Sequence, residues 1–249
     1  MDTAFDEQVF KVGKRLATKM FNASKFVLGR FEAIDPALLG PDSITHETDR
    51  ASVLELRPLI ERATAAFDQF DYAQALQLTE DFFWSTFCDN YVELSKPRTY
   101  EETLTEGRLS AASTLRLIHR ALLRMFAPFM PFLTEEIWHW TYANDPDMNE
   151  TIHRSPWPTL EEFAPVTDPT SPKTYEIVCT VVEAVRKAKA GRNLSMKAPV
   201  KVVSVTAPTA AIAALAPAAE DVKGMLHIEL LTTEEGGSTD TICHANVTF

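Results

Sequence analysis

The residues of this chain that could bind a ligand through charge lie in two segments that hold no acidic residue. Residues 8–31 carry six cations, and residues 184–201 carry six more. The whole chain has a net charge of −11, so removing these twelve positive charges leaves −23 on the remainder. An acidic chain with two concentrated basic segments is typical of a protein that guides a polyanion to a defined place.

The first basic segment predicts a helix with an apolar face and a basic face. One aromatic side chain falls on the basic face: at ~100° per residue, Phe26 projects within about 20° of Arg15. The predicted apolar face holds Phe10, Leu16, Met20, Phe21, Val27 and Leu28. The candidate binding residues of this segment are Lys11, Arg15, Lys19, Asn22, Lys25, Phe26 and Arg30.

An aromatic ring among cations fits the recognition of single-stranded RNA. Unpaired bases stack on aromatic side chains, while Lys and Arg attract the phosphates. The amide of Asn22 offers a donor and an acceptor to the edge of a base. In the alternative interpretation the cations cover a solvent-facing surface and Phe26 meets another helix. Both interpretations stay open at this point.

The second basic segment has the same ambiguity. Arg186, Lys187, Lys189 and Arg192 lie near the end of a predicted helix over residues 173–190. Cations in this position stabilise the negative end of the helix dipole. They can equally contact backbone phosphates of a nucleic acid. We predict them as a second, weaker part of an RNA-binding surface.

The sequence shows no pattern expected of a catalytic or metal site. It has no glycine-rich phosphate loop, and its six histidines are scattered. The adjacent Glu135 and Glu136 point in different directions on a helix, so they fit a role at its N-terminus better than an acid/base pair. Three separated cysteines predict reduced thiols rather than a disulfide framework. No segment is apolar enough for a signal region or a membrane span, so we expect a cytoplasmic protein.

Helical periodicity dominates the first part of the chain and predicts a mainly α protein. Helices are expected over residues 7–31, 48–69, 72–94 and 107–126. Pro58 should kink or restart the second helix, Asp71 should cap the third, and Lys96-Pro97 should close it. An apolar turn over residues 127–133 precedes a short helix that Thr134 is expected to cap. Four long amphipathic helices favour an α-helical bundle.

The rest of the chain predicts a smaller unit of mixed structure. Residues 144–172 contain six prolines and no glycine, which indicates a stiff connection. Strands are expected over residues 200–205 and 227–232, with a third in ANVTF at the end of the chain. Residues 209–225 predict a helix interrupted at Pro217. The predicted domains are a helical domain (1–160), a proline-rich linker (161–172) and a small α+β domain (173–249).

Five segments, in a fixed order, resemble a known family. KRLATKMFNASKFVL is similar to the first helix of the anticodon-binding domain of class I aminoacyl-tRNA synthetases of the valine type. The segment FFWSTFCDNYVELSK resembles the region that separates the valine from the isoleucine enzymes. Three further segments resemble junctions of the same family: APFMPFLTEEIWHW, HRSPWP and GRNLSMKAPV.

The resemblance implies a tRNA-binding role. It places Lys19, Asn22, Lys25 and Phe26 toward the anticodon loop, and the second basic segment against the tRNA backbone. Lys11 and Arg15 join this surface through the helical geometry alone. The implied partners are the anticodon stem-loop and the catalytic domain of the same synthetase, and we expect a monomer.

The family's two ATP-site signatures, of the HIGH and KMSKS type, do not occur in the sequence. We therefore expect no catalytic residue, metal site or cofactor in this chain, with ATP bound only by a catalytic domain outside it. Three alternatives remain at this point: a helical module that binds an acidic protein and no RNA, the equivalent domain of an isoleucine enzyme, and a small enzyme.

Overall fold

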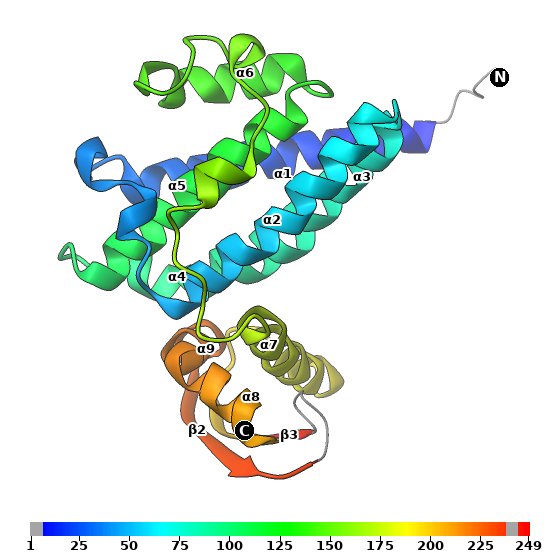
Figure 1. Cartoon of the computed structure of the whole chain (residues 1–249). Coiled ribbons are helices and arrows are strands. Elements are labelled where there is room, and N and C mark those ends of the chain that lie inside the picture. Colours follow the sequence, from blue (N-terminus) through cyan, green and yellow to red (C-terminus); the bar gives the residue numbers. More distant parts are fainter. Residues whose placement is uncertain (1–6, 238–243) are drawn as a thin grey trace.

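The computed structural model describes residues 7–237 and 244–249, which form two units (Figure 1). The larger unit is a bundle of helices and the smaller one is a three-stranded sheet with helices, so the predicted architecture is confirmed. The bundle contains α1 (Glu7–Phe31), α2 (Glu47–Asp68), α3 (Tyr72–Asp81), η3 (Phe82–Tyr91), α4 (Val92–Thr99), α5 (Glu106–Phe126) and α6 (Pro131–His139). The smaller unit contains α7 (Thr174–Gly191), β1 (Val200–Ala207), α8 (Thr209–Leu215), α9 (Ala219–Leu226), β2 (Ile228–Glu235) and β3 (His244–Thr248).

Several helix ends follow from side-chain caps that the sequence supplies. The carboxylate of Asp71 accepts a hydrogen bond from the backbone N–H of Gln74 at 3.0 Å, as predicted for the start of α3. Thr105 caps α5 in the same way, accepting from the N–H of Arg108 at 3.1 Å. These bonds satisfy donors that the first turn of a helix leaves without a partner.

Three expectations about helix ends were wrong. Pro58 does not restart α2, which runs unbroken from Glu47 to Asp68, because the flanking Leu56 and Ile60 are buried and hold both halves in place. Pro97 lies inside α4, which continues to Thr99 rather than closing. Thr134 does not cap α6, which begins at Pro131, where the missing N–H of proline costs nothing.

The expected third helix is continuous but not uniform. Its middle part, η3, has the wider hydrogen-bond pattern of a π-helix. Phe83, Phe87 and Tyr91 are buried in the bundle, as their spacing predicts. Trp84 is only half-buried, because three consecutive aromatics on a helix cannot all face the core, and its ring packs at the margin of the core against Phe83.

The bundle core contains a neutral polar chain beside its apolar side chains. His119, which is 2% exposed, lies between the hydroxyls of Ser24 and Tyr142, each 2.8 Å from one ring nitrogen. Burial lowers the pKa of His119 to about 3, so the ring is neutral. A neutral imidazole offers one donor and one acceptor, and the two hydroxyls match both.

A buried arginine joins the two units. Arg98 on α4 donates to Asp49 on α2 at 2.7 Å and to Asp221 on α9 at 2.8 Å. Its remaining hydrogen bond goes to the carbonyl of Gly107 at 2.9 Å. Burial acts to lower the pKa of Arg98, but the two carboxylates raise it overall, so the charge is retained. We call this arrangement the Arg98 clamp.

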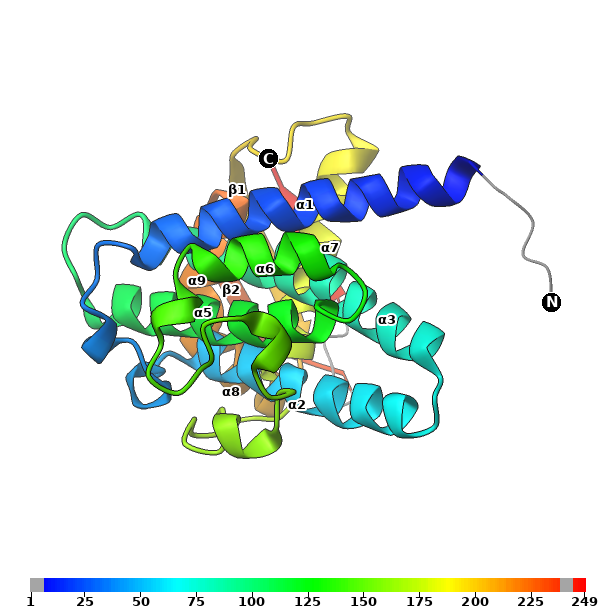
Figure 2. The same ribbon diagram turned by 90° about the horizontal axis from the view of Figure 1, so that it is seen from above.

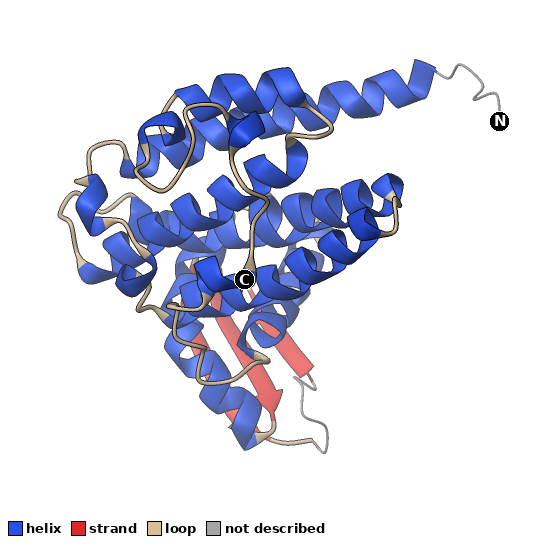
Figure 3. Ribbon diagram, turned by 45° about the horizontal axis from the view of Figure 1, so that its top comes forward, coloured by secondary structure: helices blue, strands red, loops and turns tan. Residues whose placement is uncertain are grey.

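The strands are confined to the smaller unit (Figure 3). Their order is β2-β1-β3, with β1 parallel to β2 and antiparallel to β3. Val200, Val203 and Val205 of β1 are buried among apolar side chains of α7, α8 and α9. All three strands, and the break of the Ala-rich helix around Pro217, were predicted.

The connection between the units lies against the bundle. Phe163 and Val166 are buried in the bundle core, and Arg57 on α2 pairs with Asp168 at 2.6 Å. The domain boundaries at residues 160 and 172 stay predictions. Cys88 is buried and Cys179 is partly buried, both as free thiols, whereas Cys243 lies outside the described residues. Among the described helices, none combines the length and the hydropathy needed to cross a membrane.

Candidate nucleic-acid interface

Helix α1 runs along one side of the bundle (Figure 2). Most of its cations are exposed to solvent. Leu16, Met20 and Val27 are buried, as predicted for the apolar face. Away from that face the exposed cations are Lys11, Lys14, Arg15 and Lys25. The predicted basic face of this helix is therefore confirmed.

Two members of the predicted apolar face are instead exposed. Phe10 is 65% exposed because the first turns of α1 lie at the margin of the bundle. Phe21 is 39% exposed and meets the ring of Trp140 edge-on, with centroids 5.4 Å apart. The periodicity of α1 predicts the face on which both rings lie. It does not predict whether a neighbouring element reaches far enough to cover them.

A groove between α1 and η3 holds an aromatic ring that the sequence analysis missed. Its volume is about 470 Å³, and the half-buried indole of Trp84 forms one wall. The other lining residues are Lys11, Lys14, Arg15, Thr18, Lys19 and Asn22. We call this the Trp84 groove. It brings together four cations, one amide and one large ring, with no acid in its lining.

Contacts fix the position of Lys19 in this groove. Its Nζ lies 5.4 Å from the centroid of the Trp84 ring and 3.5 Å from the carboxylate of Asp89. A cation against the face of an indole is attracted by the ring's negative electrostatic face. Lys19 is therefore held at the edge of the groove rather than free in solvent.

Phe26 is half-buried and lies among cations, but its ring does not line the groove. The guanidinium of Arg30 lies 5.2 Å from its centroid, and Nζ of Lys96 lies 5.6 Å away. The ring of Tyr100 also packs against it at 6.4 Å. The expected setting of positive charge is confirmed. The ring is not fully open to an unpaired base, because it also meets α4 and the turn after it, as the alternative interpretation expects. Its neighbours come from α4 and the following turn, which α1 alone could not reveal.

Lys25 belongs to a different part of the surface. Its Nζ lies 5.7 Å from the centroid of the Phe21 ring, on the side of α1 that faces α6. Arg30 stacks on Tyr100 at 4.4 Å from the ring centroid. The structure thus brings Lys11, Arg15, Lys19 and Asn22 together in the groove. Lys25 lines a different part of the surface, and Phe26 and Arg30 pack against Tyr100.

The second basic segment divides into exposed, tethered and buried side chains. Lys187 and Arg192 are exposed, and Arg192 lies 4.5 Å from the centroid of the Phe249 ring. Arg186 donates to the side-chain oxygen of Asn90 at 3.0 Å. It also donates to the carbonyl of Asp89.

Lys189 was wrongly included in the candidate surface. It is completely buried, and its ammonium donates to the carbonyls of Met196 and Leu226, both at 2.8 Å. Burial lowers the pKa of this lysine. The side chain holds the loop after α7 against the end of α9, so its ammonium is not available to a phosphate.

The end of η3 connects the two basic segments. Asp89 contacts Lys19 on α1 through its carboxylate and Arg186 on α7 through its carbonyl. The cations of the groove and those of α7 therefore border the same element. The missed residue, Trp84, also comes from η3, and three consecutive aromatics at residues 82–84 were the available signal. On a helix three neighbours cannot all face one core, so one of them must lie near the surface.

Comparison with known proteins identifies relatives along most of the chain. Residues 49–204 match the family model described as the anticodon-binding domain of tRNA ligase. A valine–tRNA ligase of Cutibacterium acnes is 40% identical over 95% of this chain and 26% of its own length. One from Thermobifida fusca is 40% identical over 82% of this chain and 22% of its own length. A third, from Wolbachia pipientis, is 39% identical over 83% of this chain and 23% of its own length.

The chain thus spans about a quarter of the length of these relatives. The family model covers more than half of the described chain, including α2 to α7 and most of β1. The chain belongs to the anticodon-binding domain family of tRNA ligases.

Proposed function

We propose that this chain is the anticodon stem-loop-binding portion of a valine–tRNA ligase, an enzyme that joins valine to tRNA with ATP. The single observation that carries the proposal is the Trp84 groove, where four cations surround an indole and an amide. Cations there would hold the phosphates, and Trp84 offers a face on which an unpaired base can stack. The membership in the anticodon-binding family and the valine–tRNA ligase relatives support the same role.

In this proposal the chain positions RNA and performs no chemistry. Its partners are tRNA and the catalytic part of the same ligase, where ATP and valine would bind. The exposed cations Lys187, on α7, and Arg192, directly after it, would contact the tRNA backbone beside the loop. The protein would act as a monomer in the cytoplasm, with no metal or cofactor of its own.

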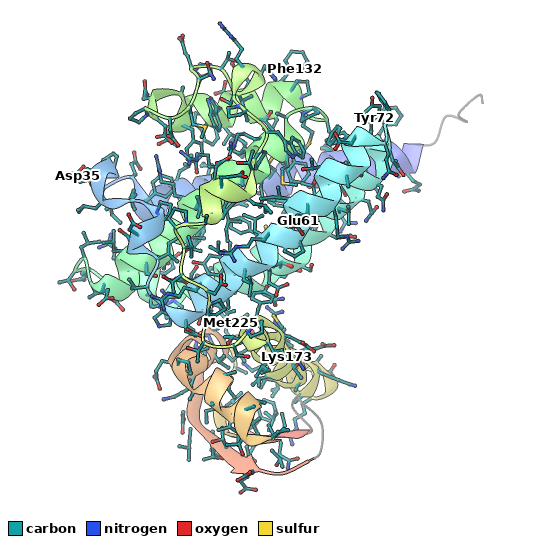
Figure 4. All side chains as sticks on the ribbon, in the orientation of Figure 1. Asp35, Glu61, Tyr72, Phe132, Lys173 and Met225 are labelled. Atoms are coloured by element: carbon teal, nitrogen blue, oxygen red, sulfur yellow. The ribbon has the colours of Figure 1, made fainter. Side chains whose placement is uncertain are left out.

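A titration with a synthetic anticodon stem-loop tests the proposal. Trp84→Leu removes the stacking surface and Lys14→Ala removes one exposed cation, and both should weaken binding. Stacking on an aromatic side chain contributes about 1–3 kcal/mol per base, so Trp84→Leu should cost more than Lys14→Ala. The matched control is Phe132→Leu, since Phe132 is 90% exposed and lies on α6, outside the groove (Figure 4).

Competition separates RNA binding from the binding of an acidic protein. The labelled stem-loop should be displaced by tRNA and not by polyglutamate of equal charge. Stem-loops with valine and isoleucine anticodons, compared at one salt concentration, separate the two ligase types. Equal affinity of the wild-type and Trp84→Leu chains would refute the proposed surface.

A further inference from the structure

A second, larger cavity lies on the other side of α1. Its volume is about 1010 Å³, within the range of sites that hold small organic groups. The second half of α1, the loop of residues 34–41 and the segment 140–147 enclose it, with α5 behind them. In Figure 4, Asp35 marks the loop that borders this cavity. The role proposed above does not use it.

Two partly exposed aromatic rings stand at this cavity. Phe21 is 39% exposed and Trp140 is 38% exposed, and the rings meet edge-on at 5.4 Å. Nζ of Lys25 lies over the Phe21 ring. Large aromatic side chains normally gain from full burial, so two that remain open beside a cavity offer apolar surface to an occupant.

The charges that line the cavity cancel, unlike those of the Trp84 groove. Three cations, Lys25, Arg116 and Arg120, are matched by three acids, Glu32, Asp145 and Asp147. Arg116 pairs with Asp145 at 2.5 Å, and Arg120 pairs with Asp147 at 3.0 Å. A phosphate would gain little here, because the guanidinium groups already have carboxylate partners. The lining therefore favours a neutral, planar occupant.

Polar groups suited to the edge of a base surround the aromatic rings. Thr141, Asn144 and Asp147 contribute a hydroxyl, an amide and a carboxylate to the lining. Arg120 is only 7% exposed, and within the described chain its Nε has no hydrogen-bond partner. A nucleobase carries carbonyl, ring-nitrogen and amino groups that these donors and acceptors can bind.

The two concave surfaces flank the same stretch of α1. Asn22 lines the Trp84 groove, and Lys25, three residues later on the helix, lines the cavity. An RNA loop crossing α1 here would meet four cations on one side and a neutral aromatic cavity on the other. We propose that the Phe21–Trp140 cavity takes a second unstacked nucleobase of the RNA loop whose phosphates lie in the Trp84 groove. This inference rests on the proposed function and adds a site to it.

The test measures coupling between the cavity and single loop bases. The full chain, its Phe21→Leu/Trp140→Leu variant and the Phe132→Leu control are titrated with the anticodon stem-loop. A set of stem-loops, each lacking the base at one loop position, is titrated in parallel. We expect the double variant to bind the intact stem-loop about 5- to 150-fold more weakly. Removing the base at one particular loop position should weaken binding to the wild-type chain to a similar extent. Removing the same base should leave the affinity of the double variant nearly unchanged, because the variant has already lost the contact.

Salt dependence provides an independent readout. Loss of stacking removes no phosphate contact, so the slope of log K against log salt should stay that of the wild-type chain. Lys14→Ala should instead reduce the slope by about 0.7. A reduced slope in the double variant would mean that the cavity binds phosphate, and would overturn the inference.

The remaining outcomes separate this inference from the proposed function. If the wild-type chain binds the stem-loop but no loop base shows coupling to the double variant, the inference is overturned and the proposed function stands. If the double variant binds the intact stem-loop as tightly as the wild type, the inference is also overturned. A protein segment would then be the next occupant of the cavity to test. Failure of the wild-type chain to bind the stem-loop at low salt overturns the proposed function and this inference together. Circular dichroism of both variants verifies that they are folded.

Discussion

Replacing Arg98 by methionine should destabilise the protein more than any surface substitution. Arg98 is 8% exposed, while Asp49 and Asp221 are 0% and 2% exposed. Methionine keeps much of the volume but leaves two buried carboxylates without their cation. Removal of one partner from a buried ion pair costs about 3–5 kcal/mol, so we expect a loss of this size in the free energy of unfolding. Urea denaturation followed by circular dichroism measures it.

The same variant has a predictable pH dependence. Burial acts to raise the pKa of Asp49, but the charge and hydrogen bonds of Arg98 lower it overall. In the wild type this carboxylate therefore contributes stability above its unfolded pKa of about 3.9, which is lost as the pH falls through the lower folded value. Without Arg98, the raising effect of burial on the pKa of Asp49 is opposed only by the smaller effects of the Ser110 hydrogen bond and of His46, so we expect the folded pKa to exceed the unfolded one. The variant should therefore recover stability as the pH falls from near 7 to about 5.

Asp168→Asn is the matched control, because the Arg57–Asp168 pair joins a 25% exposed and a 66% exposed side chain and the change keeps the bonds from Arg57 to the carbonyls of Phe163 and Val166. A pair this exposed contributes about 0–1 kcal/mol. Arg98→Met with a loss no larger than that of Asp168→Asn would refute the reasoning. So would a loss that grows as the pH is lowered to about 5.

Three further predictions concern buried groups elsewhere. In the wild type, the folded pKa of His119, about 3, lies below its unfolded value of about 6.5, so the free energy of unfolding rises with pH between these values. His119→Gln removes this titration and should flatten that part of the pH dependence. Lys189→Met should lower the free energy of unfolding by about 1–3 kcal/mol, because two carbonyls lose their donor, whereas Lys187→Ala should leave it unchanged. Gly224→Ala should destabilise the contact between the units by about 1–3 kcal/mol, since a Cβ there would lie 2.6 Å from the Pro97 ring. Urea denaturation measures all three, with the first repeated across pH.

The helices were predictable because their signals are local. The span of α1, the cap at Asp71 and the three strands follow from periodicity, capping residues and β-branched runs. The errors at Pro58, Pro97 and Thr134 have two causes. A local rule about proline or a cap was overridden by packing from other elements, or by proline acting as a helix start rather than a helix end.

The candidate site was predictable only on the element that carries it. The basic face of α1 follows from its own sequence, but Trp84 reaches the groove from an element more than fifty residues later. The burial of Lys189 depends on carbonyls of the loop after α7 and the end of α9. Local sequence periodicity predicts neither of these contacts, because both depend on residues distant in the sequence. The Arg98 clamp likewise joins α2, α4 and α9, and each of its members alone looks like an ordinary surface charge.

The structure also changes how many cations can bind RNA. Twelve positive charges in two segments would give a slope of log K against log salt near −8, at about 0.7 per phosphate on a single strand. Lys189 is buried, Arg186 is tied to Asp89 and Asn90, and Arg30 stacks on Tyr100. The Trp84 groove retains four cations, namely Lys11, Lys14, Arg15 and Lys19. With Lys187 and Arg192, which the proposed function adds, six cations predict a slope of about −4. A slope near −8 would mean that the contacts described here open when RNA binds, and that the surface is not preformed.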